Sequence, residues 1–147
     1  MKKYLVILFA IALMSSACSP AEPAPSLTGT TWNLTSYGSV STLKPVAAEE
    51  GKLTLSPDGK LTGVGACNEF SGTYEVKGGQ IIFSHFDWGS TFCPEPQMRQ
   101  ESTVYDTLDN HTVDYKVEGK TLTLTRPLSG GNGFVLVFEA VSNSTEN

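Results

Sequence analysis

The sequence predicts a mainly β domain, a small antiparallel β-barrel-like fold of about seven or eight short strands with one α-helix. Two observations carry this prediction. From residue 27 onward, short segments of alternating apolar and polar residues are separated by turns rich in Gly, Pro and Asp. One stretch, residues 98–108, contains neither Gly nor Pro and follows two prolines. Closing the strands into a barrel would remove the free sheet edges.

The strands can be assigned in order along the chain. Residues 30–37 alternate so that Trp32 and Leu34 share one face, and Trp32 is expected in the core. The segments flanking the turn 57–59 form a hairpin, because Pro-Asp-Gly is a strong turn signal. The expected strands after the first are residues 52–56, 60–64, 70–76, 81–83, 113–117, 121–125 and 134–141, with strict alternation in 52–56 and 121–125.

The single helix is expected over residues 98–108. Prolines and an acidic residue precede it, as is typical of a helix first turn. Met98, Tyr105 and Leu108 are spaced to share one helical face, with Val104 beside them. We therefore expect this face to pack against an open side of the sheet.

The amino terminus has the form of an export signal. Lys2 and Lys3 precede an uncharged apolar run over residues 4–14, which is too short to span a bilayer. Residues 15–18, Ser-Ser-Ala-Cys, resemble the lipobox of bacterial lipoproteins, and this resemblance implies a signal peptide of residues 1–17 and lipidation of Cys18. The alternative is ordinary secretory cleavage after Ala17, which would release a soluble protein.

The expected mature chain has three parts. Residues 18–26 carry Cys18 and a Pro-rich tether, residues 27–141 form the domain, and residues 142–147 form a disordered polar tail. Ser19 in place of Asp after Cys18 resembles the sorting pattern of bacteria with two membranes, and this resemblance implies delivery to an outer membrane, facing the periplasm, if the cell has two membranes. A secreted or periplasmic soluble protein is the alternative location.

Charge and cysteine count narrow the possibilities further. The formal net charge is −5 and the domain has no Lys/Arg cluster, so nucleic-acid binding is disfavoured. If Cys18 is acylated, Cys67 and Cys93 remain as a pair in an oxidising compartment, and a disulfide is the default expectation. The alternative is two separately buried thiols.

Catalytic, metal and cofactor sites are not indicated. His85 and Asp87 flank Phe86, but His111 is distant in sequence, and no group of residues has metal-ligand spacing. No nucleophile elbow is present, and the glycines near Cys67 lack the Lys that a phosphate-binding loop needs. We expect these glycines to permit bulges or close strand crossings, and Asn68 to take a left-handed turn conformation or to bond backbone groups.

One segment is unusually aromatic. Residues 83–92 hold four aromatic side chains, which either fill the mouth of the barrel or form a recognition surface. Core filling is the simpler interpretation because the domain has few other large residues to bury. If a surface is functional, its candidate residues are His85, Phe86, Trp88 and Phe92.

Residues 61–74 resemble the signature of META-domain proteins, the heat-shock HslJ-like family. The matching positions are Gly63, Gly65, Cys67, Asn68, Gly72 and Tyr74. Trp32 matches the opening W-x-L of that family, and Met98 with Glu101 matches the M-x-x-E pattern of its helix. Ala66 departs from the pattern, since the family usually has Gly directly before the Cys. The resemblance implies a small barrel-like fold with a helix, in envelope proteins without an established catalytic activity.

Taken together, the sequence predicts a non-enzymatic, monomeric lipoprotein of the cell envelope. Its partners would be the membrane, through Cys18, and an envelope protein not identified by sequence, in an interaction or envelope-stress role. Two alternatives remain open. One is a carrier that holds a small apolar ligand inside the barrel. The other is an inhibitor of an extracellular hydrolase that uses the loop 129–133.

Overall fold

The structure is a computed structural model that describes residues 24–47 and 51–141. The expected signal peptide 1–17, the lipidation site Cys18, most of the tether and the tail 142–147 lie outside the described residues. Within the described part of the chain, no helix combines the length and apolar character that crossing a bilayer requires.

Strands make up most of the domain, with one helix inserted after the sixth strand. The elements are β1 (Thr31–Ser39), β2 (Thr42–Pro45), β3 (Lys52–Leu55), β4 (Lys60–Val64), β5 (Glu69–Lys77), β6 (Gln80–Trp88), α1 (Gln97–Leu108), β7 (Thr112–Glu118), β8 (Thr121–Pro127) and β9 (Gly133–Ala140).

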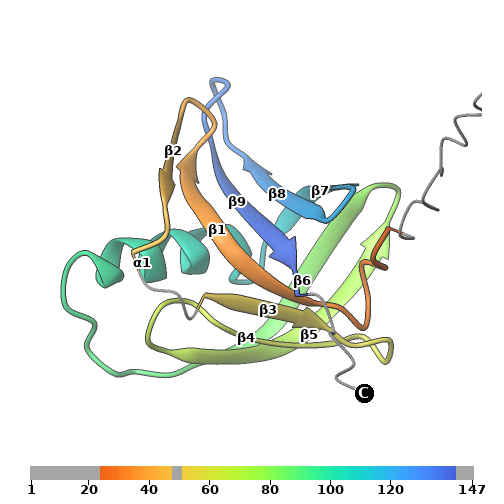
Figure 1. Ribbon diagram of the computed structural model, residues 1–147, viewed down its shortest axis with the longest axis horizontal. Coiled ribbons are helices and arrows are strands. Elements are labelled where there is room, and N and C mark those ends of the chain that lie inside the picture. Colours follow the sequence, from red (N-terminus) through yellow and green to blue (C-terminus); the bar gives the residue numbers. More distant parts are fainter. Residues whose placement is uncertain (1–23, 48–50, 142–147) are drawn as a thin grey trace, which may run out of the picture.

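The strands form a closed antiparallel barrel. Neighbours pair in the order β2-β1-β3-β4-β5-β6-β7-β8-β9, and a further pairing of β1 with β9 joins the two ends of the sheet (Figure 1). Eight strands thus complete the ring, while β2 pairs only with the far half of β1, from Ser36↔Pro45 to Ser39↔Thr42. The predicted fold class, a small antiparallel barrel with one helix, is confirmed.

β1 makes closure possible because it is long and changes partners along its length. Its first residues pair with β3, and the register with β9 runs from Trp32↔Ala140 to Ser39↔Phe134. A register shift between Leu34 and Ser36 marks an irregularity in that pairing. Such irregularities raise local twist and help a strand turn a corner of a barrel.

Period-2 alternation directs the apolar side chains into the barrel. In β3, for example, Leu53 and Leu55 are fully buried while Lys52 is exposed. Trp32 is fully buried at the centre of the same core, as its place in the alternation predicts. Phe83 and Phe138, each 2% exposed, are the next largest fully buried side chains after Trp32. The interior is therefore filled with side chains.

α1 lies beside the barrel, to the left in Figure 1, and packs against β1, β7, β8 and β9. Its predicted extent was nearly right, but the predicted packing face was partly wrong. The buried positions are Gln100, Val104, Thr107 and Leu108, an i, i+4, i+7, i+8 stripe. Tyr105 is 45% exposed instead. Gln100 and Thr107 can occupy buried positions because their side chains form hydrogen bonds there. Tyr105 lies on the exposed side of the helix.

Candidate functional site

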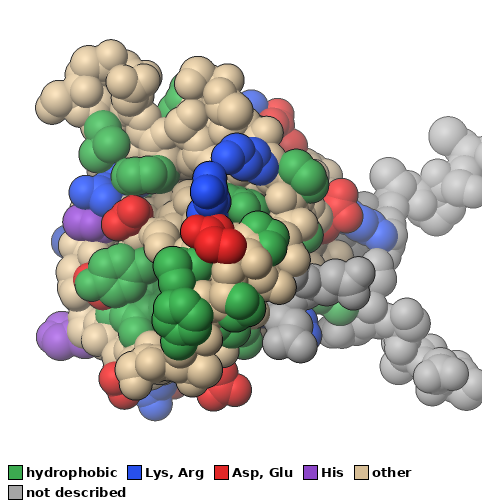
Figure 2. Space-filling model, turned by 90° about the vertical axis from the view of Figure 1, so that its left-hand side faces the viewer, with side chains coloured by type: hydrophobic (Ala, Val, Ile, Leu, Met, Phe, Trp, Pro, Cys, Tyr) green, Lys and Arg blue, Asp and Glu red, His purple; other side chains and the backbone are tan. Residues whose placement is uncertain are grey.

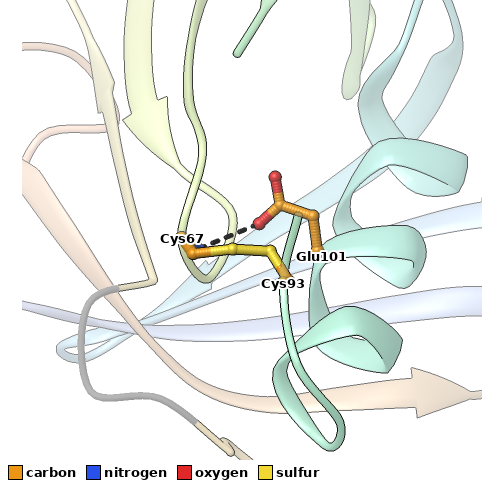
Figure 3. Close-up of side chains that lie close together, drawn as sticks. All are labelled: Cys67, Cys93 and Glu101. Atoms are coloured by element: carbon orange, nitrogen blue, oxygen red, sulfur yellow. Dashed lines mark hydrogen bonds between the residues drawn. A yellow bond between two sulfur atoms is a disulfide. The ribbon is translucent and has the colours of Figure 1, made fainter. Parts of the chain in front are cut away.

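The loop between β4 and β5, residues 65–68, is tied to the segment that leads into α1. Cys67 and Cys93 form a disulfide with a Cα–Cα distance of 6.2 Å. Cys67 is exposed, whereas Cys93 is only 4% exposed. Figure 3 shows the bridge lying between the loop and the helix, with Glu101 of α1 facing it (Figure 3). The bridge fixes the start of the helical segment to the end of the barrel.

Glu101 caps the same loop electrostatically. Its Oε2 atom accepts hydrogen bonds from the backbone N–H groups of Ala66 (2.6 Å), Cys67 (3.1 Å) and Asn68 (3.4 Å). Three successive N–H groups that converge in this way form a concave nest for one negatively charged oxygen. The carboxylate therefore holds both the loop conformation and the position of the helix.

Asn68 bonds a second segment, the one between β6 and α1. Its Nδ2 donates to the carbonyl of Thr91 at 2.9 Å, and its Oδ1 accepts the Thr91 N–H at 2.7 Å. The side chain is 7% exposed and Nδ2 also lies 3.6 Å from Cys93 Sγ. Of the two expectations for Asn68, backbone bonding is the one observed, since the described non-glycine residues with positive φ are His85 and Asn110.

Gln100 is a structural residue that the sequence analysis missed. Its side chain is fully buried, Oε1 accepts the Ala47 N–H at 2.7 Å, and Nε2 donates to the Gly65 carbonyl at 2.9 Å. A buried amide needs such partners, because an unpaired one is costly. The sequence offers no indication of this burial, because a polar residue beside Glu101 in a helix normally indicates a solvent-exposed position.

The motif glycines act through close approach, as expected. A Cβ atom on Gly63 would collide with the Lys52 carbonyl and with the ring of Phe70. One on Gly65 would lie 2.7 Å from Glu101 Oε2, and one on Gly72 would lie 3.0 Å from the Ser84 carbonyl. Gly72 also sits at the register shift between Ser71 and Thr73, where it lies opposite the bulge of β6. The glycines thus let the strands, the loop and the helix pack closely.

Tyr74, the last residue of the motif, holds the β3–β4 turn. Its hydroxyl donates to the Ser56 carbonyl at 2.7 Å. Partial burial, with a smaller contribution from the charge of Asp58, raises the pKa of Tyr74 above its ordinary value. The motif as a whole is therefore a set of structural contacts.

The aromatic segment divides between core and surface. Phe83 is buried, while Phe86 and Trp88 are half-buried and stack at 5.6 Å and 15°. Trp88 also contacts Phe70 at 4.5 Å and Tyr105 of α1 at 5.2 Å between ring centroids. The simpler interpretation, core filling, therefore describes Phe83 fully and Phe86 and Trp88 partly.

Two of the predicted surface residues lie outside this stack. Phe92 is 79% exposed, the most exposed of the large hydrophobic side chains described. His85 is exposed in the bulge of β6, has a φ of 55° and lies with its Nδ1 3.1 Å from Thr73 Oγ1. In Figure 2, hydrophobic side chains gather on the face that carries α1 and the loop before it (Figure 2). Phe92 of that loop, Tyr105 of α1 and Trp88 at the end of β6 are together called the aromatic surface.

A cavity of about 370 Å³ opens between the end of β6 and α1. Its lining residues are Asn68, Trp88, Gly89, Glu101, Ser102, Tyr105 and Asp106. Two larger cavities, of about 610 and 510 Å³, also include exposed residues in their lining. The first is lined mainly by polar side chains on the outer face of β3, β4 and β5.

One cluster among the described residues brings together metal-ligand atom types, namely Cys67, Cys93 and Glu101. Its donor atoms are already in use. The two sulfurs are joined to each other, and the N–H groups that point at Glu101 Oε2 create a positive field. As built, the cluster is a covalent bridge beside a capping carboxylate.

These features define a class of protein: a small closed antiparallel barrel with an external helix, tied to the barrel by a disulfide and a buried polar network. The family profile of the META domain matches residues 25–141, and the chain belongs to the META domain family. The resemblance seen in the sequence is confirmed.

Comparison with solved structures agrees with this fold. One is titled an NMR structure of the protein from Burkholderia xenovorans, with a TM-score of 0.59 and 20% identity over 84% of this chain and 97% of that one. A second, titled an NMR structure of the protein, has a TM-score of 0.57 and 19% identity over 75% of this chain and 87% of that one. No curated protein gives a significant match. At these identities the likeness concerns the fold alone.

Proposed function

We propose that this META-domain protein is exported, anchored to the cell envelope through a lipid on Cys18, and acts by binding another envelope protein without catalysing a reaction. The anchor rests on the lipobox-like residues 15–18 and the apolar run before them. The domain supplies the binding surface. Its role is structural or stress-related support of the envelope.

The observation that carries the binding role is the way Phe92 is presented. Its side chain is 79% exposed, yet both neighbours are fixed, Thr91 by the Asn68 amide and Cys93 by the disulfide. A large aromatic side chain on a constrained backbone loses little conformational freedom when it is buried by a partner. Such residues commonly dominate the energetics of protein interfaces.

The proposal of a non-enzymatic protein draws on the chemistry of the same region. The exposed cysteine is oxidised, and Glu101 Oε2 is occupied by three backbone N–H groups. In this arrangement the disulfide-bonded cysteine is not available as a nucleophile, and the Oε2 atom is not available as a general base. The polar groups of the motif instead connect the barrel, the loop and the helix.

The carrier alternative has weaker support. An apolar ligand inside the barrel would compete for space with fully buried Trp32, Leu53 and Leu136. The inhibitor alternative depends on the loop between β8 and β9. A backbone hydrogen bond from the Leu128 N–H to the Asn132 carbonyl closes that loop at 2.8 Å, and its residues are exposed.

Intact mass spectrometry of the membrane-extracted protein tests the anchor. The expected species begins at Cys18, carries added acyl mass and gains two alkylatable thiols only after reduction. A Cys18→Ser variant should lack the acyl mass. An unmodified Cys18 in the wild-type protein would rule out the anchor.

Site-directed photo-crosslinking in living cells tests the binding role. A photoreactive phenylalanine analogue replaces Phe92, and Val76, which is 40% exposed on β5, serves as the matched control position. We expect a discrete adduct from position 92, absent from position 76 and reduced when Cys67→Ser and Cys93→Ser release the loop. Identical adduct patterns from both positions would contradict a specific surface.

A further inference from the structure

Aromatic and acidic side chains line the cavity of about 370 Å³ between β6 and α1, and they indicate which kind of group a partner could place there. Trp88 of β6 and Tyr105 of α1 form two of its walls, with ring centroids 5.2 Å apart and planes inclined at 55°. Two inclined aromatic faces make a corner that suits a flat or cationic group, because the ring face carries partial negative charge.

Carboxylates complete this corner. Glu101 and Asp106 of α1 both line the cavity. Glu101 is held through Oε2, whereas its Oε1 atom accepts no hydrogen bond from the described residues. Among the described ion pairs, none involves Glu101 or Asp106.

The potential around the cavity is negative. A hydrogen bond to Asp109, together with the charges of Asp109 and Asp106, raises the pKa of Tyr105 above its ordinary value. Arg126 donates to the backbone carbonyl of Asp106 and lies over the ring of Phe134. The chain as a whole has a net charge of −5, so its field favours cationic groups.

We propose that this cavity binds an arginine side chain presented by the partner protein, an inference that rests on the proposed binding function. The guanidinium plane lies against Tyr105 and Trp88, while its N–H groups donate to Glu101 Oε1 and to Asp106. Arginine is favoured over lysine because its planar, weakly hydrated group stacks on aromatic faces and forks onto carboxylates. Phe92 then supplies the apolar contact on the same aromatic surface.

NMR titration of the isotope-labelled protein with N-acetylarginine amide tests the site directly. The Trp88 indole N–H, which has no acceptor among the described residues, is distinguishable from that of Trp32, which donates to the Leu27 carbonyl. We expect saturable shifts at Trp88, Tyr105 and Asp106, with a dissociation constant on the order of millimolar for so small a probe. The neutral isostere N-acetylcitrulline amide should give no saturable shift.

Paired variants separate charge from packing. Asp106→Asn should weaken arginine binding by about 3- to 10-fold, and Tyr105→Leu by a similar factor, whereas Tyr105→Phe retains the ring and most of the affinity. Asp114→Asn makes the same charge change on β7 and should leave binding unaltered. Equal shifts with citrulline, or equal effects of Asp106→Asn and Asp114→Asn, would overturn the proposal.

The two proposals fail independently. Adducts from position 92 without arginine binding would leave the protein-binding function in place and remove arginine as the recognised group. Arginine binding without adducts at position 92 would preserve the cavity as a cation site and remove the proposed partner.

Discussion

Asn68 and Thr91 face each other across two loops, and the Asn68 side-chain amide exchanges two hydrogen bonds with the Thr91 backbone, at 2.9 and 2.7 Å. The amide thereby reproduces the pairing of a neighbouring strand where no strand is present. Because Asn68 follows Cys67 directly, this contact and the disulfide hold the same two segments together. The segment that carries Phe92 is thus fixed on both sides of this residue, at Thr91 and at Cys93.

Replacing Asn68 should be costly for this reason. Asn68→Ala leaves the N–H and the carbonyl of Thr91 without their side-chain hydrogen-bond partners. It is expected to lower the free energy of unfolding by about 2 kcal/mol. Urea denaturation followed by far-UV circular dichroism measures the change. Asn132→Ala, at an exposed loop position, should change stability by less than about 0.5 kcal/mol. Equal losses for the two variants would show that the Thr91 contact is unimportant.

Glu101 offers a test of charge against shape. Glu101→Ala leaves the N–H groups of Ala66, Cys67 and Asn68 without their acceptor and should cost about 2–3 kcal/mol of unfolding free energy. Glu101→Gln keeps an acceptor oxygen and should cost about 1 kcal/mol. Thermal denaturation of the three proteins gives the order. A glutamine variant as unstable as the alanine variant would show that the negative charge, and not the acceptor, is required.

Gly63 should tolerate no side chain. Gly63→Ala places a methyl group against the Lys52 carbonyl and the ring of Phe70, so strands β3 to β5 must shift. We expect a loss of about 3 kcal/mol or more. Gly72→Ala meets the Ser84 carbonyl at 3.0 Å and should be milder. Chemical denaturation ranks the pair, and a more harmful Gly72 variant would contradict the packing argument.

His111 should make stability depend on pH in a defined range. Burial, assisted by the charge of Arg126, lowers the pKa of His111 below the ordinary value of 6.5, with Asp109 and Asp106 opposing the shift. The unfolded chain therefore binds the proton more readily than the folded chain between the folded pKa and 6.5.

Its contribution to stability is then complete above pH 6.5 and is lost as the pH falls through the folded pKa. Urea midpoints measured from pH 8 to pH 5 should fall more steeply for the wild-type protein than for His111→Gln. Parallel curves would exclude His111 as the titrating group.

Much of the local structure could be predicted because it depends on neighbours in the chain. The turn Pro57-Asp58-Gly59 with its flanking alternation specified the β3–β4 hairpin, and residues 98–108 differ from the observed helix by one residue. Other elements could not be predicted in this way. β2 has four exposed residues and no apolar alternation, and β6 runs on to Trp88 through a bulge at His85 that interrupts period 2.

The sequence by itself determined the antiparallel β class, the turns, the burial of Trp32 and the family, because these follow from periodicity, turn chemistry and a local motif. Only the tertiary structure decided that β1 meets β9, that Glu101 and Asn68 act on the Cys67 loop, and that Tyr105 faces a cavity beside Trp88. These contacts join residues far apart in the chain. Their geometry depends on barrel closure and on which helix face the buried Gln100 selects, and neither is encoded in any local pattern.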